Sequence, residues 1–555
     1  MFGSRVMTRL IYICRISFIP VLISTILAGQ TAIAQPAEFW NAQAKDTLEN
    51  ALKAQRLNLN VAKNVILFIG DGMDISTSTA ARIRKGQLAG QPGEEASLQW
   101  EHFPHVALSK TYNTDLQVGD SAGTATAFLC GVKSKSGTLG LDDRVQYGNC
   151  SSGIGGEVDS ILKVAQKAGK STGFVSTTRV THATPAGLYA HTPHRAWEYK
   201  NRIPTESQLE GCKDIAVQLI ENGKDINVIM GGGRGNFMTN YTKDPEETKY
   251  HGRRRDNRDL IEEWIALRPD KDRSRYVWNL TEFNKVDERK VDYLLGLFEY
   301  SHMQYESARE NDKAGEPSLS EMTEKAIKIL QKNKNGFFLL AEGGRIDHGH
   351  HKGVAYDALH DTLALDKAVS KAMELCQEDD TLIIVTADHG HVMTIAGYPS
   401  RGNPILGLHD SYIAKDDMPY TTLSYANGPG GLELTDSFNE DGTRRNLTEV
   451  DTEDEDFIQS AAVPLSDETH GGQDVAIYAY GPMAHLFHGV HEQHYIAHVM
   501  MYAACLGKYT EKCEVKYQEQ QVMCGGSSCF KSESLMLLIV MFIMFIVTTL
   551  SINSD

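Results

Sequence analysis

Five short apolar runs stand out along the chain and are separated by longer segments of mixed character. They are NVILFIG (64–70), STGFVST (171–177), INVIMGG (226–232), FFLLAEGG (337–344) and TLIIVTADHG (381–390). None alternates strictly between apolar and polar positions, which is typical of strands covered on both faces in a mainly parallel sheet. The sequence therefore predicts an α/β fold.

Chemically active side chains enter the pattern where four of these runs end. They are Asp71, His182, Glu342 and the pair Asp388 and His389. In parallel sheets, ligands bind outside the carboxyl ends of the strands. We therefore expect these groups to converge on one crevice.

Both ends of the chain carry apolar segments. Residues 1–34 contain Arg5, Arg9 and Arg15, then an apolar stretch and the small residues AIA, and are interpreted as a cleaved secretory signal; a retained membrane anchor is the alternative. Small residues at 525–528, a polar spacer and an apolar run at 535–550 have the order of a glycolipid-anchor signal whose tail is removed. A retained single span is the competing interpretation.

Charge, cysteine content and glycosylation sequons indicate where the protein is located. The 55 Lys and Arg against 72 Asp and Glu give a formal charge of -17, which argues against nucleic-acid binding. Of nine cysteines, Cys14 would leave with the signal, and the other eight would lie in an oxidising compartment. Asn-X-Ser/Thr sequons at Asn149, Asn240, Asn279 and Asn446 fit the same compartment.

Acidic and histidine residues gather in three clusters that indicate metal binding. Asp347 and His351 are four apart and share a face if the segment turns helically, with His348 and His350 nearby. TADHGH supplies Asp388, His389 and His391, and SDETHGGQD supplies His470 beside two acids. Three clusters favour more than one ion over solvated loop histidines. Asp with His suits zinc, whereas an all-oxygen set suits magnesium.

Three further positions admit two interpretations. Asp71 lies in a Gly-Asp-Gly turn and is either a turn former or a metal ligand. Asp120 and Ser121 precede a run of small residues, so either one is a helix N-cap, or Ser121 is a hydroxyl activated by a nearby cation for attack on phosphorus. Arg195 suits two phosphoryl oxygens, although a surface ion pair is the common role. Ser121 has no histidine in its own motif, which disfavours a hydrolase triad.

Six motifs in order, GDGM, DSAGTATA, THATPAG, EGGRIDHGHH, TADHGH and ETHGGQDV, resemble the alkaline phosphatase family and its animal, membrane-anchored branch over about residues 39–513. The resemblance implies a three-layer α/β sandwich with a large, mainly parallel sheet and an inserted crown. It implies hydrolysis of small phosphate monoesters, with Ser121 as the nucleophile that becomes phosphorylated and Arg195 binding the phosphoryl oxygens. Other superfamily chemistry, on diesters, sulfate esters or phosphosugars, and a non-catalytic surface protein are the alternatives.

The same resemblance implies a metal centre. One zinc would be held by Asp347, His351 and His470, and a second by Asp71, Asp388 and His389. A magnesium would take Asp71, Thr184 and Glu342, with His182 in its outer shell, while His348 and His350 are not carried over as direct ligands. A structural calcium would take Glu246, the Phe298 carbonyl, Glu299 and Glu316.

The resemblance also implies the organisation of the chain. Disulfides would join Cys150 to Cys212 and Cys505 to Cys513, leaving Cys130 and Cys376 as buried thiols. An N-terminal arm and a crown at a dimer interface would make a homodimer, held by a lipid anchor on the extracellular face of the plasma membrane. The expected parts are a signal (1–34), the arm (35–56), the catalytic domain (57–396 and 465–513), the crown (397–464), a tail (514–534) and a removed apolar signal (535–555). Asp74 stands where relatives in the family commonly have Gly or another small residue, and it adds a carboxylate near the turn of Asp71.

Overall fold

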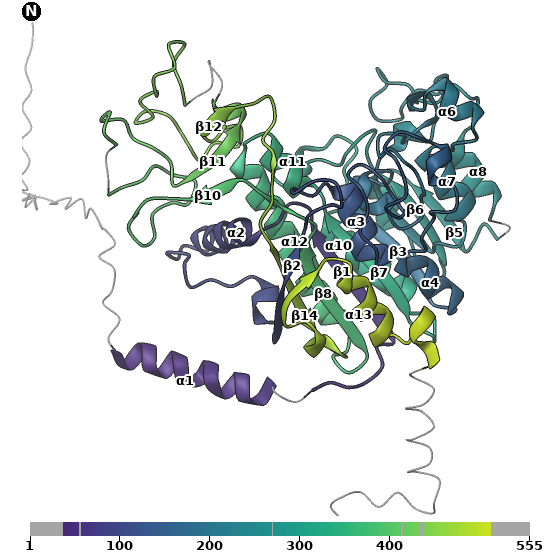
Figure 1. Cartoon of the computed structure of the whole chain (residues 1–555), viewed down its shortest axis with the longest axis horizontal. Coiled ribbons are helices and arrows are strands. Elements are labelled where there is room, and N and C mark those ends of the chain that lie inside the picture. The colour runs from purple at the N-terminus through teal and green to yellow at the C-terminus, as the bar shows by residue number, and fades with distance from the viewer. Residues whose placement is uncertain (1–36, 55–56, 269, 412–413, 432–436, 512–555) are drawn as a thin grey trace, which may run out of the picture. The chain divides into compact units, whose positions relative to one another are not determined.

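The computed structural model describes residues 37–54, 57–268, 270–411, 414–431 and 437–511 (Figure 1). Two compact units, Met1–Leu52 and Lys53–Asp555, make up the chain. In the expected arm, α1 (Ala37–Ala54) is a helix of 18 residues. The expected signal, the tail, the removed apolar segment and Cys513 lie outside the described residues.

The second unit contains a ten-stranded sheet with the order β15-β2-β14-β8-β1-β7-β3-β4-β6-β5. β14 pairs antiparallel with β8 and β2, and every other pair in this sheet is parallel. The predicted α/β class with a mainly parallel sheet is confirmed. The strands are β1 (Asn64–Gly70), β2 (His105–Lys110), β3 (Ser171–Arg179), β4 (Val228–Gly232), β5 (Ser274–Val277), β6 (Tyr293–Leu297), β7 (Phe337–Gly343), β8 (Thr381–Ala387), β14 (Val475–Tyr480) and β15 (Gly489–Glu492).

The central strands separate two hydrophobic cores, one on each face of the sheet. Along β1, Val65 and Leu67 pack into one core and Ile66 and Phe68 into the other, because successive side chains of a strand point to opposite faces. Helices α3, α4, α7, α8 and α13 contribute to the first core, and α2, α10 and α12 to the second (Figure 1). Burial on both faces explains why these strands are continuously apolar.

The helices of this unit are mostly short. None of the helices in the described ranges is long and apolar enough to cross a membrane. Their bounds are α2 (Ile75–Leu88), α3 (Ser121–Cys130), α4 (Ile161–Lys167), α5 (Ala183–Ala186), α6 (Thr205–Leu209), α7 (Ile215–Asn222), α8 (Leu260–Ala266), α9 (Leu280–Asn284), α10 (Leu319–Leu330), α11 (Arg345–His351), α12 (Ala355–Leu375) and α13 (Tyr495–Ala503).

Two small sheets lie outside the main one. β10 (Met393–Ile395), β11 (Leu423–Gly428) and β12 (Ala461–Pro464) form a three-stranded sheet to which segment 397–464 contributes two strands. β9 (Gly390–His391) pairs antiparallel with β13 (His470–Gly471), His391 opposite His470. This short pairing brings the second and third predicted ligand clusters together.

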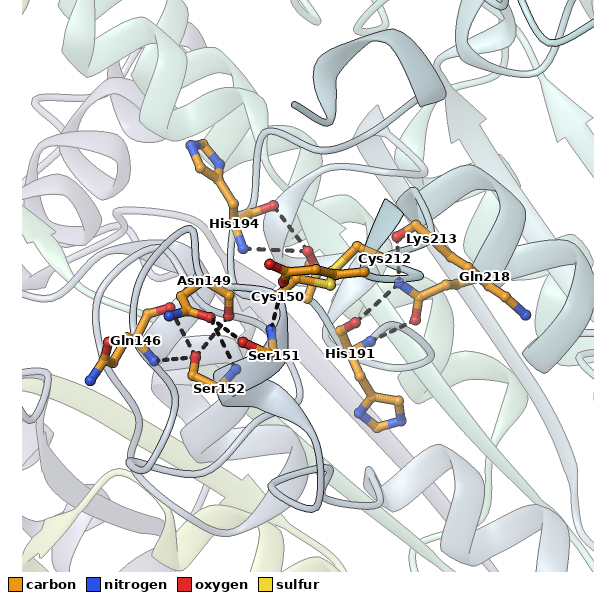
Figure 2. Close-up of a disulfide and its surroundings, with 12 residues drawn as sticks. Gln146, Asn149, Cys150, Ser151, Ser152, His191, His194, Cys212, Lys213 and Gln218 are labelled. Carbon is orange, nitrogen blue, oxygen red and sulfur yellow. Dashed lines mark hydrogen bonds between the residues drawn. A yellow bond between two sulfur atoms is a disulfide. The ribbon is translucent and has the colours of Figure 1, made fainter. Parts of the chain in front are cut away.

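A disulfide joins Cys150 to Cys212, 62 positions apart in the sequence (Figure 2). Around it, Gln218 Nε2 donates to the His191 carbonyl at 3.1 Å, and the His191 N–H donates to Gln218 Oε1 at 2.8 Å. Cys130 and Cys376 are free thiols, as expected, but both are only partly buried because each lies at the margin of a hydrophobic core.

Candidate active site

Three adjacent strands, β8, β1 and β7, deliver acids to one edge of the main sheet. Asp71 directly follows β1, Glu342 is the penultimate residue of β7, and Asp388 directly follows β8. All three side chains are buried, and the Gly72 N–H donates to Asp388 Oδ1 at 2.9 Å. The predicted convergence of the strand ends is therefore observed.

The turn after β1 requires a glycine. Gly72 has φ of 71°, and a Cβ there would lie 2.3 Å from Cδ2 of the His391 ring. A side chain at this position would be strained and would displace the histidine. The glycine after Asp71 thus lets the ring of His391 pack directly against this turn.

One acid-histidine group forms around Asp347. Helix α11 places Asp347 and His351 on one face, as their spacing predicted, with His351 Nε2 3.2 Å from Asp347 Oδ1. The same oxygen lies 3.3 Å from His470 Nε2 and 3.0 Å from His391 Nε2. Four potential ligand atoms thus lie within 4.8 Å of one another.

A second group forms around Asp71. His389 Nε2 lies 3.5 Å from Asp71 Oδ1 and 3.2 Å from Asp388 Oδ2. Asp71, Asp347 and His389 also offer ligand atoms within 4.8 Å of one another, so the two groups share Asp347. Each group mixes carboxylate oxygen with imidazole nitrogen, the combination that suits zinc.

Ser121 begins helix α3 and faces the second group. Its Oγ lies 3.2 Å from His389 Nε2 and 3.5 Å from Asp71 Oδ1. The helix is capped by Asp120, which accepts hydrogen bonds from the N–H groups of Ala122 and Gly123. Asp120 and Ser121 were both candidates for the N-cap of this helix, and Asp120 is the cap. The hydroxyl of Ser121 is therefore directed at the second acid-histidine group.

A cationic side chain adjoins the start of α3. Arg195 Nη1 donates to Asp120 Oδ2 at 3.2 Å, and its Nη2 lies 3.2 Å from His182 Nε2. The guanidinium is partly buried rather than on the surface, with 26% of the side chain exposed. It is therefore oriented beside the serine by a carboxylate and can still be reached by a ligand.

Several buried polar atoms here have no hydrogen-bond partner in the described structure: Asp71 Oδ2, Glu342 Oε1 and Thr184 Oγ1. The other oxygen of Glu342 accepts hydrogen bonds from the hydroxyls of Ser176 and Thr178. Buried polar atoms are normally satisfied, and a cation satisfies oxygen atoms of this kind. The donor set fits metal ions.

Electrostatics supports the same conclusion. Burial, followed by repulsion from Asp388, Asp347 and Glu342, raises the pKa of Asp71 well above its usual range. Burial likewise raises the pKa of Glu342 to about 7. Burial lowers the pKa of His389 well below its usual range, so the ring is neutral and able to ligate. A bound cation would remove the cost of keeping these carboxylates ionised.

His391 and Glu468 lie in the clusters expected from the sequence, although neither was assigned to an ion, and the two residues extend the first group. His391 Nε2 contacts Asp347, and its Nδ1 contacts Glu468 Oε2 at 2.5 Å. Although burial opposes protonation, Glu468 and Asp347 raise the pKa of His391 to about 10. The histidine is thus a charged link between two acids, and the alternation of His389 and His391 around Gly390 was the available indication.

The histidines that were not assigned as ligands have other partners. His350 Nδ1 lies 2.8 Å from the hydroxyl of Tyr425, and its Nε2 lies 3.0 Å from Thr77 Oγ1. His348 Nδ1 lies 3.1 Å from Arg345 Nη1. Neither belongs to the potential metal groups found in the described part of the chain.

An acidic group separate from the serine contains Glu246, Glu299 and Asp312, whose ligand atoms lie within 4.8 Å of one another. Asp312 was not among the expected calcium ligands. Glu316, which was, is buried nearby, where its Oε1 accepts from the Gln304 N–H at 2.8 Å and its Oε2 has no partner. Asp312 lies four residues before Glu316 in an acidic loop, the only sequence indication of its position.

The chain is similar to known proteins over most of its length. It is 53% identical to the tissue-nonspecific alkaline phosphatase of Rattus norvegicus over 86% of this chain and 90% of that protein. It is 52% identical to the alkaline phosphatase of Gadus morhua over 85% and 98% of the two chains. The solved alkaline phosphatase of Thermus thermophilus shares the fold, with a TM-score of 0.56 at 23% identity over 85% of this chain and 95% of that one. Residues 62–506 match the family model of alkaline phosphatase, and the chain belongs to the alkaline phosphatase family.

Proposed function

We propose that this protein hydrolyses phosphate monoesters through a phosphorylated Ser121, at a centre of two zinc ions and one magnesium ion. The observation that carries the proposal is the position of Ser121 Oγ, 3.2 Å from His389 Nε2 at the N-terminus of α3. A helix N-terminus favours the anionic phosphate group. Family membership supports the phosphatase activity itself.

The proposed ligands follow the chemistry of the donors. Asp347, His351 and His470 would hold one zinc, and Asp71, Asp388 and His389 the other. The oxygens of Asp71, Thr184 and Glu342 would hold magnesium, with His182 in its outer shell. Oxygen-only sets suit magnesium, and mixed sets suit zinc.

In the reaction, Ser121 Oγ attacks phosphorus and the P–O bond to the alcohol breaks, leaving a phosphoserine. Water then attacks that phosphorus, and Ser121 regains its hydroxyl as inorganic phosphate forms. When bound, the cations would favour the serine alkoxide and stabilise negative charge on both sides of phosphorus. Arg195, held by Asp120, would bind two phosphoryl oxygens in a bidentate arrangement.

Substitution of the nucleophile tests the proposal. Ser121→Ala should lower turnover of a nitrophenyl phosphate monoester by at least about 10³-fold, because removal of a nucleophile leaves only binding and charge stabilisation. Zinc content measured on the same sample should remain that of the unaltered protein. Near-normal turnover with full zinc content would contradict the proposal, and faster hydrolysis of the diester than of the monoester by the unaltered protein would favour phosphodiester chemistry.

A calcium site is proposed at the separate acidic group. Glu246, the Phe298 carbonyl, Glu299 and Glu316 are the expected ligands, and Asp312 is added because its carboxylate lies with Glu246 and Glu299. Burial raises the pKa of Glu299 to about 7 and that of Glu316 well above its usual range, which a divalent cation would reverse.

Assembly and location are proposed from the sequence. Segments 35–56 and 397–464 would serve as the arm and the crown of a homodimer. The catalytic domain would consist of residues 57–396 and 465–513. A removed signal at 1–34, a tail at 514–534 and a removed segment at 535–555 would leave the protein lipid-anchored outside the cell, with Cys505 bonded to Cys513 and glycans on Asn240, Asn279 and Asn446. The support for this organisation is the sequence resemblance to the animal, membrane-anchored branch of the family.

A further inference from the structure

Asp74, three residues after Asp71, is a buried carboxylate with 2% of its surface exposed. Its Oδ1 caps helix α2 by accepting from the Thr77 N–H at 2.8 Å, and also accepts from the Thr77 hydroxyl at 3.0 Å. Its Oδ2 accepts from the side-chain amide of Gln473. The side chain therefore joins the turn after β1 to a segment almost 400 residues later.

Gln473 follows His470 by three residues, and its side-chain amide donates two hydrogen bonds. Besides Asp74, its Nε2 donates to the His391 carbonyl at 2.9 Å. The two side chains meet over Gly390, where an added Cβ would lie 2.5 Å from Gln473 Nε2 and 2.9 Å from Asp74 Cβ. A glycine at this point is what allows the contact.

We propose that the Asp74–Gln473 pair is a positioning device that holds the strand of His470 against the turn of Asp71, and thereby slows release of zinc from Asp347, His351 and His470. The inference rests on the zinc assignment of the proposed function. Neither residue belongs to the proposed ligand sets; each acts through the backbone of a ligand-bearing segment.

Few other contacts of the backbone hold the segment that carries His470, so the Asp74–Gln473 pair matters for its position. β13 and β9 pair over only two residues each, so few backbone hydrogen bonds hold His470 in place. His470 Nδ1 has one further contact, at 2.8 Å from the Gly119 carbonyl. The hydrogen bond between Asp74 and Gln473 is partly buried, because Gln473 itself is exposed. A hydrogen bond to a charged group is about twice as strong as a neutral one, so its loss should be measurable at the neighbouring strand.

The network continues from Thr77 to His350 and Tyr425. Thr77 Oγ1 lies 3.0 Å from His350 Nε2, and His350 Nδ1 lies 2.8 Å from the Tyr425 hydroxyl in β11. His350 also stacks on His391, with ring centroids 4.6 Å apart. Asp74 is thus fixed from both sides, which a side chain that positions another segment requires.

The test is a reversal of the pair. Gln473→Glu keeps the size of the side chain but turns a carboxylate toward Asp74. The variant should release zinc to a chromogenic chelator about tenfold faster, the expected result of losing one partly buried hydrogen bond to a carboxylate. The double variant Asp74→Asn with Gln473→Glu restores an amide–carboxylate pair in the opposite direction, and Asn is an equally good helix cap. Its zinc release should return to within about threefold of the unaltered protein, since its bond to the His391 carbonyl stays lost.

A control is Gln218→Glu, the same change at a glutamine whose amide likewise donates to the backbone, at residues 191 and 213 beside the disulfide, although Gln218 is buried and Gln473 is exposed. It should leave zinc release unchanged. A second measurement, amide hydrogen exchange at 390–391 and 470–471 in the metal-free protein, should be faster in Gln473→Glu and restored in the double variant.

Zinc release at the unaltered rate in Gln473→Glu, or no recovery in the double variant, would overturn the inference. If the single variant is purified without zinc, unchanged exchange at 390–391 and 470–471 would overturn it, and faster exchange that the double variant restores would support it. Absence of zinc from the unaltered protein would instead refute the proposed metal centre, and the exchange measurement would still decide whether the pair holds the strand.

Discussion

Glu342 is a single residue whose ionisation the metal-free fold opposes. Its pKa of about 7 in the folded chain exceeds the usual value, so its contribution to stability is present at low pH and lost as pH rises toward 7. Glu342→Gln should therefore leave metal-free stability nearly unchanged at pH 4.5 and raise the free energy of unfolding by about 3 kcal/mol at pH 8. Unfolding of both metal-free proteins at the two pH values checks this.

With magnesium added at pH 8, the order should reverse, because only the carboxylate gains a cation. A stability difference between the two proteins that is the same at both pH values would contradict the assigned cause.

The same residue shows what sequence can predict about the site. Glu342, Asp71 and Asp388 were foreseeable because each ends an apolar run, whereas the contact of His391 with Glu468 depends on a two-residue strand pairing that leaves no periodic pattern.

Helix α3 is the element that presents Ser121, and Asp120 is the residue that begins it. Asp120 accepts from Gly123 N, Gly137 N and the Asn113 amide, all through Oδ1, while Oδ2 receives Arg195. Asp120→Ala should lower the free energy of unfolding by about 2 kcal/mol, from the lost cap and the donors left without an acceptor. Asp120→Asn keeps an oxygen for the cap and should lose less than half as much, as measured by denaturant unfolding.

Equal losses in the two variants would show that the ion pair with Arg195, rather than the cap, gives Asp120 its effect. Although burial opposes ionisation, Arg195 and the backbone donors lower the pKa of Asp120, so its charge persists at neutral pH. The pair is therefore present throughout the range in which a phosphatase of this family would be assayed.

Strands were predictable at the centre of the sheet and not at its margins. The five apolar runs are β8, β1, β7, β3 and β4, which are neighbours in that order. Four of these strands are buried at every residue, and β3 is buried at all but its two end residues. β2 and β15 are partly exposed and carry His, Ser and Glu, so their pattern resembles that of a loop. β14 is short and rich in tyrosine and alanine, which does not separate a strand from a buried helix.

At the scale of the whole molecule, the proposed zinc ligands come from the turn after β1, from α11, from the segment after β8 and from β13. Removing the ions would leave Asp71, Asp347, Asp388 and Glu342 buried together, with repulsion among them. Chelation should therefore lower the thermal midpoint of the whole unit, and readdition of zinc should raise it. The free energy of unfolding should rise with the logarithm of free zinc, by about 1.4 kcal/mol per tenfold increase for each site near saturation.

Salt distinguishes this cause from the general charge of the chain. The formal charge of -17 is a surface effect, screened within about 10 Å at 0.1 M salt, whereas repulsion among buried carboxylates is screened much less. The midpoint of the chelated protein should thus recover with zinc and not with about 0.5 M sodium chloride. Recovery in salt alone would mean that net charge destabilises the metal-free chain. A thermal midpoint that does not respond to zinc would mean that the four segments are held together without ions.

Asp347→Asn tests the same point by mutation, because Asp347 lies in both acid-histidine groups. Loss of its carboxylate should abolish most of the rise in thermal midpoint that zinc produces.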